Sequence, residues 1–198
     1  MEEQPLGLAA QKSLIGTPEL HLLIEQDTKD TMFVPVAEIN HAIWCIASAT
    51  GLRPSSFGPD KSRNELEFPF VAWQDLQFTR IRTLKTGHFL VEITIRYIMG
   101  NKQKAEVNRA TKNLVFEVSS PSKAANLLLS VPHRLLVIAL RRGVLEGIST
   151  VKELVDGQQM HIKIKEEFKE TPLFLKAVDT RTTMKKDVAL PASSLSRY

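Results

Sequence analysis

The sequence predicts an α+β fold in which helices flank a three-stranded antiparallel sheet, and three segments carry that prediction. Residues 36–49 place apolar side chains at helical spacing, and Gly51 follows, a residue type that often ends helices. Residues 88–99 alternate apolar and polar side chains, as a half-buried strand does. Residues 127–142 form an aliphatic run whose basic end and following Gly143 are typical of a helix C-terminus.

The N-terminal part predicts a loose arm followed by a single domain. Residues 1–16 show no periodicity, and we expect an arm there, with the domain covering residues 17–198. A helix opens at Thr17-Pro18-Glu19: Thr17 is a candidate cap, Pro18 suits the first turn, and Glu19 complements the helix dipole.

The predicted sheet is a meander of three strands. The first strand begins at Leu76, the second is residues 88–99, and the third is residues 111–118. The turn between the last two strands is the polar stretch 100–104. The side chains expected to share this one antiparallel sheet are Ile81, Phe89, Val91, Ile93, Ile95, Leu114 and Phe116.

Shorter elements are expected after the sheet. Pro132 should kink or restart the helix of residues 127–142. Residues 149–153 open a short helix, 172–178 form a brief apolar strand or buried segment, and 193–198 resemble the start of another helix.

Composition narrows the class of protein. The hydrophobic share of 43% and the charged share of 24% among 198 residues predict a globular domain with a core. The net charge of +4 fits a polyanionic partner without requiring one. Cys45 is the one cysteine, and no cysteine–histidine cluster has zinc spacing. We therefore expect no metal or cofactor. No apolar stretch is long enough to cross a membrane, and the N-terminus is acidic, so we expect an intracellular protein.

The segment most indicative of chemistry is Ala49-Thr50-Gly51-Leu52-Arg53-Pro54. A helix ends there, glycine turns the chain, and Arg53 stands at the turn. Arginine presents a planar fork that binds phosphate through two parallel hydrogen bonds. The alternative interpretation is an ordinary surface arginine after a helix cap.

Basic residues concentrate before and within the predicted hairpin. They could line a track for DNA phosphates, or they could be lysines and arginines that protect a solvated sheet edge. The residues in question are Lys61, Arg63, Arg80, Arg82, Lys85, Lys102, Lys104, Arg109 and Lys112.

The order of three features resembles the catalytic domain of tyrosine recombinases. These features are Thr50-Gly51-Leu52-Arg53, then Trp73-Gln74-Asp75-Leu76, and then a hairpin with a lysine-bearing turn. The resemblance implies that Arg53 is the first catalytic arginine and that Lys102 or Lys104 is the hairpin lysine acting as general acid. A gapless alignment places Met99 at the lysine position, and a shift of one residue restores a lysine. The glutamate that the family often has shortly after the arginine is replaced here by Ser56 or Phe57.

A narrower resemblance covers about residues 33–198. The Thr50–Pro54 turn, the strand 88–99, the helix 135–143 and the segment 192–196 are similar to the recombinase-like "captain" proteins of the giant Starship transposons of fungi. This implies a nuclear protein that acts on double-stranded DNA, with self-association on DNA as a further expectation. The family's reaction passes through a phosphotyrosyl intermediate and needs no metal.

The chain lacks several parts that the resemblance requires. We find no candidate for the second arginine or the His/Tyr box, and Tyr198 is rejected as nucleophile because no His-x-x-Arg box precedes it. His133-Arg134 lacks that spacing and is interpreted as a helix start. The sequence therefore predicts a partial recombinase-like domain that binds DNA but is inactive alone; the alternative is a non-catalytic remnant serving as an interaction or structural module. The expected DNA-binding residues are Arg53, Lys61, Arg63, Lys102, Lys104 and Arg109.

Overall fold

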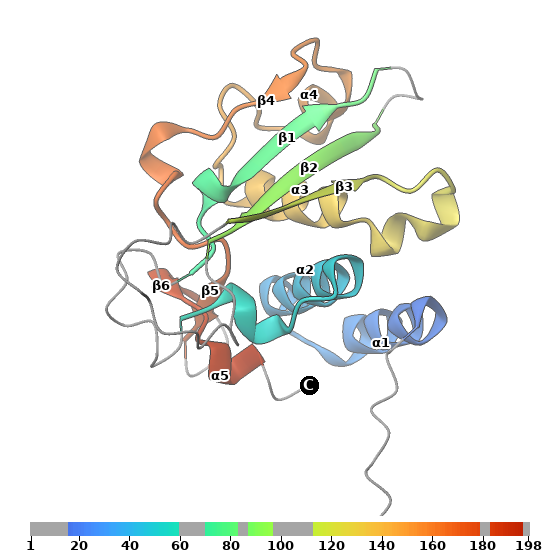
Figure 1. Ribbon diagram of the computed structural model, residues 1–198, viewed down its shortest axis with the longest axis vertical. Helices are drawn as coiled ribbons and strands as arrows, with labels where there is room; N and C mark the ends of the chain where they lie inside the picture. The colour runs from blue at the N-terminus through green and yellow to red at the C-terminus, as the bar shows by residue number, and fades with distance from the viewer. Residues whose placement is uncertain (1–15, 60–69, 83–86, 97–112, 179–182, 196–198) are drawn as a thin grey trace, which may run out of the picture.

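The computed structural model describes residues 16–59, 70–82, 87–96, 113–178 and 183–195 (Figure 1). The fold is α+β, as predicted. Helix α3 (Val131–Arg141) lies against the sheet, α2 (Val34–Thr50) packs on α3, and α1 (Thr17–Asp30) packs on α2. A short two-stranded sheet lies at one end of the molecule, apart from the main sheet (Figure 1).

The main sheet is antiparallel and has four strands in the order β3-β2-β1-β4. The predicted meander is confirmed as β1 (Leu76–Arg80), β2 (Phe89–Ile95) and β3 (Leu114–Ser119). The alternation of β2 is confirmed, since Phe89, Val91, Ile93 and Ile95 are each buried and the residues between them are half-buried. Ile81 lies just past β1, where its N–H donates to the His88 carbonyl at 2.9 Å.

The prediction of three strands was wrong by one strand. β4 (His161–Ile162) pairs with β1 through Phe78 and Thr79. Two residues are too short for a period-2 pattern to be recognised, because the signal needs several alternating positions. The strand exists because the free edge of β1 supplies hydrogen-bonding partners.

The starts of α1 and α2 differ from the prediction, whereas the end of α2 agrees with it. Thr17 was expected to cap this helix, but it is the first helical residue, and Gly16 occupies the cap position without a side-chain bond. Helix α2 begins at Val34, two residues earlier than predicted, with a proline in its first turn. It ends as predicted, because Gly51 adopts the left-handed conformation (φ 70°) that costs glycine least.

Pro132 restarts the chain as a new helix, as expected. The 3₁₀ helix η4 (Ala124–Leu129) precedes it, so the predicted helix 127–142 is divided between η4 and α3, with Pro132 in the first turn of α3. Helix α4 (Val151–Asp156) starts with a capping box between Thr150 and Glu153. The Thr150 hydroxyl accepts from the Glu153 N–H at 3.2 Å, and the Glu153 carboxylate accepts from the Thr150 N–H at 3.1 Å.

The short two-stranded sheet belongs to a small lobe that joins distant parts of the chain. It contains the 3₁₀ helix η1 (Pro54–Phe57), the strands β5 (Leu175–Ala177) and β6 (Met184–Ala189), and helix α5 (Ala192–Leu195). We call these four elements the η1–α5 lobe. β5 falls inside the predicted segment 172–178, whereas β6 was missed because its Met-Lys-Lys-Asp-Val-Ala sequence has no apolar alternation. Short 3₁₀ turns η3 (Trp73–Asp75) and η5 (Glu166–Phe168) complete the fold.

The buried face of β2 should dominate stability. Ile93→Ala removes a side chain that is 1% exposed and should lower the free energy of unfolding by about 2–5 kcal/mol. Val115→Ala on β3 is the control, because that side chain is 57% exposed and should change stability by less than about 0.5 kcal/mol. Urea denaturation measures both, and equal losses would contradict this packing.

Candidate nucleic-acid interface

Arg53 stands at an exposed turn between α2 and η1. The Thr50 hydroxyl donates to the Ile46 carbonyl at 2.8 Å and accepts from the Leu52 N–H at 3.3 Å, which fixes the turn before Arg53. The Arg53 carbonyl accepts from the Ser56 N–H at 2.8 Å and opens η1. Within the described ranges the Arg53 guanidinium makes no hydrogen bond or ion pair, so its donors face solvent.

The turn is held against the C-terminal part of the chain. Phe57 is 2% exposed and meets Phe174 edge-to-face, with ring centroids 6.3 Å apart. A Cβ placed on Gly58 would overlap the Leu190 carbonyl oxygen and lie 3.1 Å from the Ala192 nitrogen. The Ala192 N–H donates to the Pro59 carbonyl at 2.9 Å. Backbone contacts thus place the start of α5 directly beside the segment that carries Arg53.

The other predicted site residues, Lys61, Arg63, Lys102, Lys104 and Arg109, lie outside the described residues, as do Lys85, Lys112 and Tyr198. The strand ends that flank residues 97–112 are described. Ile95 pairs with Leu114, so this connection leaves the sheet at the end where β1 begins.

The Trp-Gln-Asp element shapes that end of the sheet. Trp73 is fully buried, and Asp75 accepts from the Ala72 N–H at 2.9 Å. The other Asp75 oxygen contacts the Arg96 guanidinium at 2.6 Å, which ties the start of β1 to the end of β2. Burial raises the pKa of the Asp75 carboxyl, and the Ala72 N–H and Arg96 oppose that rise. These residues therefore position the sheet and are not exposed to a ligand.

Two further arginines, Arg80 and Arg142, make hydrogen bonds inside the protein. Arg80 reaches the carbonyls of Glu153, Leu154 and Gln159, where it closes the C-terminal end of α4. Arg142 donates to the Pro172 and Leu173 carbonyls at 2.9 and 3.0 Å and lies over the Trp73 ring, 5.3 Å from its centre. Burial lowers the pKa of Arg142 to about 10. Arg80, predicted as part of a phosphate track, is thus 6% exposed and used internally, because carbonyl oxygens surround its guanidinium.

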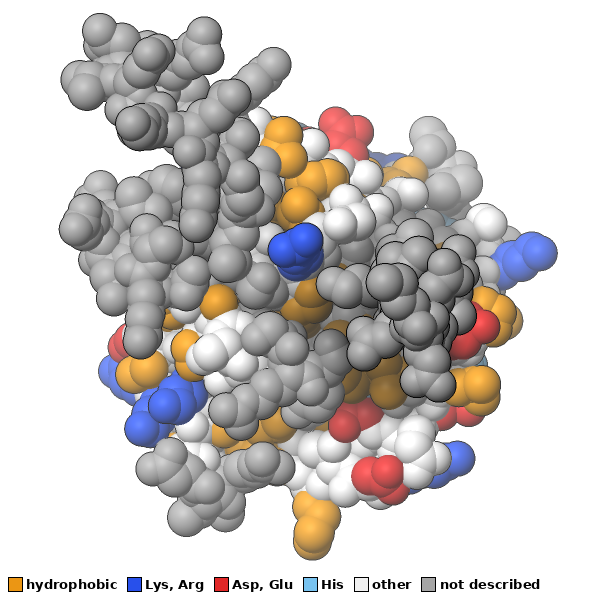
Figure 2. Space-filling view, turned by 60° about the horizontal axis from the view of Figure 1, so that its bottom comes forward, with side chains coloured by type: hydrophobic (Ala, Val, Ile, Leu, Met, Phe, Trp, Pro, Cys, Tyr) orange, Lys and Arg blue, Asp and Glu red, His pale blue; other side chains and the backbone are white. Residues whose placement is uncertain are grey.

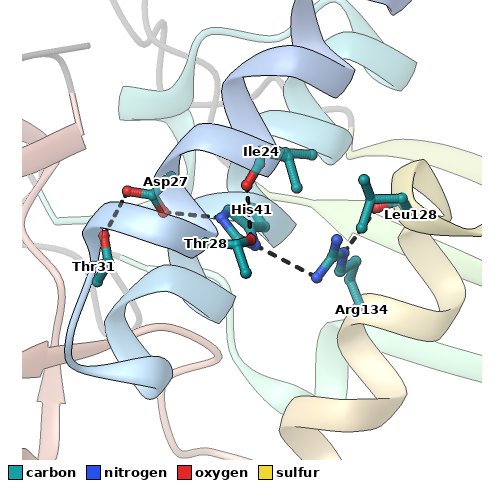
Figure 3. A network of polar contacts seen from close by, with 7 residues as sticks. All are labelled: Ile24, Asp27, Thr28, Thr31, His41, Leu128 and Arg134. Atoms are coloured by element: carbon teal, nitrogen blue, oxygen red, sulfur yellow. Dashed lines mark hydrogen bonds and ion pairs between the residues drawn. The ribbon is translucent and has the colours of Figure 1, made fainter.

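Arg134 belongs to a polar network that joins the helices (Figure 3). His41 of α2 lies between Asp27 of α1 and Arg134 of α3: its Nε2 is 2.9 Å from the Asp27 carboxylate, and its Nδ1 is 3.4 Å from the Arg134 guanidinium. Since guanidinium only donates, Nδ1 is an acceptor and the ring proton faces Asp27. Arg134 also donates to the Leu128 carbonyl at 2.9 Å, and the network therefore ties α1, α2 and η4 to α3.

This network is not a nucleophilic site. Cys45 stands one helical turn from His41 on α2 but is 2% exposed, and burial raises the pKa of its thiol to about 11. A thiol rather than a thiolate is present at neutral pH, and a catalytic cysteine needs the thiolate. The residues that the structure describes contain no cluster of His, Cys, Asp and Glu able to hold a metal ion.

The interpretation of His133 as part of a helix start is confirmed. It stands in the first turn of α3, where its Nδ1 is 2.7 Å from the Ser130 hydroxyl and its Nε2 donates to the Gly87 carbonyl at 3.0 Å. Burial lowers the pKa of this imidazole. The ring is therefore a neutral tie between α3 and the start of β2.

On one face of the molecule, the basic side chains of the described residues are dispersed. Figure 2 shows Lys and Arg side chains scattered among hydrophobic and acidic ones on the face it presents, rather than gathered in one large patch. On the open face of the main sheet, Glu92 of β2 lies directly opposite Glu117 of β3, a pairing that repels phosphate. Contact with DNA through that sheet face is therefore disfavoured.

Searches for similarity find no family model, curated protein or solved structure that matches this chain. Among the described helices none is long and apolar enough to span a membrane.

Sequence reasoning placed Arg53 correctly after the end of a helix but missed its C-terminal neighbours. The signal that could have indicated them is Gly58, which follows a buried phenylalanine and permits close approach of another backbone.

Gly58→Ala should loosen the η1–α5 lobe. The φ of Gly58 is −124°, which any residue adopts, so the cost of about 1–3 kcal/mol comes from overlap with the Leu190 carbonyl. Hydrogen exchange should rise in β6 and α5. Gly51→Ala is the control: it imposes a left-handed alanine costing about 1–2 kcal/mol but meets no atom within 4 Å, and it should loosen the end of α2 instead. Identical exchange patterns would argue against the backbone contact.

Stability should fall in mild acid through His41. Burial, and then the Arg134 charge, lower the pKa of this imidazole, while Asp27 opposes the shift. Because the unfolded state binds the proton first, His41 stabilises the fold fully above about pH 6.5 and loses this contribution as pH falls below that value. Urea denaturation of His41→Gln between pH 7.5 and 5.5 should show a shallower dependence than the native chain. His161→Gln, at an exposed position, should keep the native slope.

Proposed function

We propose that this chain is a double-stranded-DNA-binding domain of the tyrosine-recombinase type, from a mobile element of the captain kind, in which Arg53 contacts a DNA phosphate. The order of elements supports this: a helix ending in Thr-Gly-Leu-Arg, a Trp-Gln-Asp turn, an antiparallel meander and a helix packed on its buried face. That order is the one expected from the resemblance.

The observation that carries the proposal is the contact between the Arg53 turn and α5. A recombinase site requires groups from both parts of its catalytic domain around one phosphate. Here Gly58 and Ala192 bring the segment after Arg53 and the start of α5 together. The described part of α5 therefore belongs to the same lobe as Arg53.

The chemistry available to Arg53 differs from that of the internal arginines. Arg80, Arg134 and Arg142 already donate to carbonyl oxygens, and they cannot turn to a phosphate without breaking buried contacts. Arg53 is exposed, and no described residue holds its guanidinium in a hydrogen bond or ion pair, so the fork of donors can make a bidentate phosphate contact. Replacing Arg53 should therefore affect binding and leave the fold intact.

Binding to DNA should be weak, tolerant of sequence and steeply dependent on salt. Arg53→Ala should weaken affinity for a duplex by about 1–3 kcal/mol, because a charge-assisted phosphate contact is lost, with little change in melting temperature. Lys152→Ala is the matched control, since Lys152 is exposed on α4 at the opposite end of the molecule. Fluorescence anisotropy at several salt concentrations gives the affinities, and equal effects of the two variants would contradict a specific role for Arg53.

The chain by itself should neither cleave nor join DNA. A missing electrostatic donor alone costs about 100- to 1000-fold in rate, and the sequence offers no second arginine or preceding box for Tyr198. A nicked suicide duplex tests this: no covalent protein–DNA adduct should form. An adduct that disappears in Tyr198→Phe would show that Tyr198 is a nucleophile after all.

A non-catalytic interaction module is the second candidate. It is favoured by apolar side chains exposed along β3, where Leu114 is 36% and Val115 57% exposed. β3 is also an edge strand of the main sheet, and the unpaired backbone groups of a sheet edge can pair with a second chain. A duplex titration with no binding even at low salt would favour this function over the first.

A further inference from the structure

Within the η1–α5 lobe, the base of the β5–β6 hairpin packs against η1. The Leu190 N–H donates to the Phe174 carbonyl at 2.9 Å, and Phe174 packs against Phe57 of η1. The hairpin therefore rises from the same small lobe that carries the Arg53 turn (Figure 1).

A bulge interrupts the hairpin above this base. Leu175 pairs with Ala189 and Ala177 with Met184, so Lys176 of β5 lies opposite the whole stretch 185–188 of β6. Asp187 has a φ of 57°, the left-handed region that a non-glycine residue enters at a cost. Bulges of this kind redirect side chains and occur preferentially next to functional sites. Here the bulge brings Lys185 and Lys186 of one strand opposite Lys176 of the other.

The bulge contains one acidic residue, Asp187, whose side chain is exposed. Burial lowers the pKa of Arg142, and the Asp187 carboxylate opposes that shift. Arg142 itself is fixed by the Pro172 and Leu173 carbonyls at the foot of the hairpin. Among the described residues of the hairpin, three lysines against one carboxylate leave the bulge with an excess of positive charge.

We propose that the bulged β5–β6 hairpin is a second phosphate-contacting arm, in which Lys176, Lys185 and Lys186 bind the backbone of the duplex that Arg53 contacts. This inference rests on the proposed function. Lysine is suited to the role, since its point charge on a flexible stem binds phosphate without demanding one geometry. The arm would supply affinity and orientation but no reading of sequence.

The test compares two double variants with equal changes in charge. Lys185→Gln/Lys186→Gln removes two charges from the bulge, and Lys152→Gln/Lys163→Gln removes two exposed charges from the α4 and β4 end. Each is titrated with a duplex of arbitrary sequence by fluorescence anisotropy over a range of salt concentrations. The bulge variant should lose about 3- to 30-fold in affinity at low salt, and the slope of log affinity against log salt should fall by roughly two, one per lost phosphate contact.

The control variant should retain the native slope. If the native chain binds and both double variants lose affinity equally, the hairpin is no specific arm and the inference fails, while the proposed function stands. If the native chain does not bind at all, the proposed function fails first. Circular dichroism checks the fold of each variant. Should the bulge variant unfold, Lys186→Gln alone, at an exposed position, must lower the slope by roughly one for the inference to hold.

Discussion

Alternate residues of β2 are buried beneath α3, and most of the other contacts depend on that packing. Val91 and Ile93 form the centre of the core, while β1 and β3 pair with the two sides of β2 and extend its buried face. A register slip of one residue would turn the charged side chain of Glu92 into this core, so the pairing is strongly determined. The helices follow, since α3 covers β2, α2 covers α3, and α1 covers α2.

The polar side chains inside this arrangement are ties between layers. His133 joins α3 to the start of β2, Arg80 joins β1 to α4, and His41 joins α1 to α3 through Asp27 and Arg134. Both histidines are held neutral by burial, so each needs one donor and one acceptor in fixed directions. Such requirements specify a single arrangement of helices more strictly than apolar packing does. They also explain why a basic chain presents few free arginines on its described surface.

The sequence predicted the elements whose signals are local and long. Residues 36–49 and 88–99 each contain enough periodic positions to identify a helix and a strand, and Gly51 and Pro132 mark real boundaries because their backbone preferences are intrinsic. β4 and β6 could not be predicted, since a two-residue strand and a lysine-rich bulged strand form only where a partner strand is already in place. The same reason applies to the candidate site. Arg53 was found from its own turn, but the hairpin beside it depends on Gly58 meeting Leu190 across more than half of the chain.

The residues that stabilise the core and the residues proposed to bind phosphate lie in different parts of the molecule. Arg80, Arg134 and Arg142 donate to carbonyl oxygens near the main sheet and its helices, and the open sheet face carries the opposed Glu92 and Glu117. Phosphate is thus disfavoured where the core is built. The η1–α5 lobe has the opposite character: a small buried base around Phe57, an exposed arginine on one side and a lysine-bearing bulge on the other. Because its base is formed by backbone approach at a glycine, the lobe can vary its exposed side chains without disturbing the core. Affinity for a polyanion can then change through a few exposed charges on the lobe, while the packing of the core stays the same.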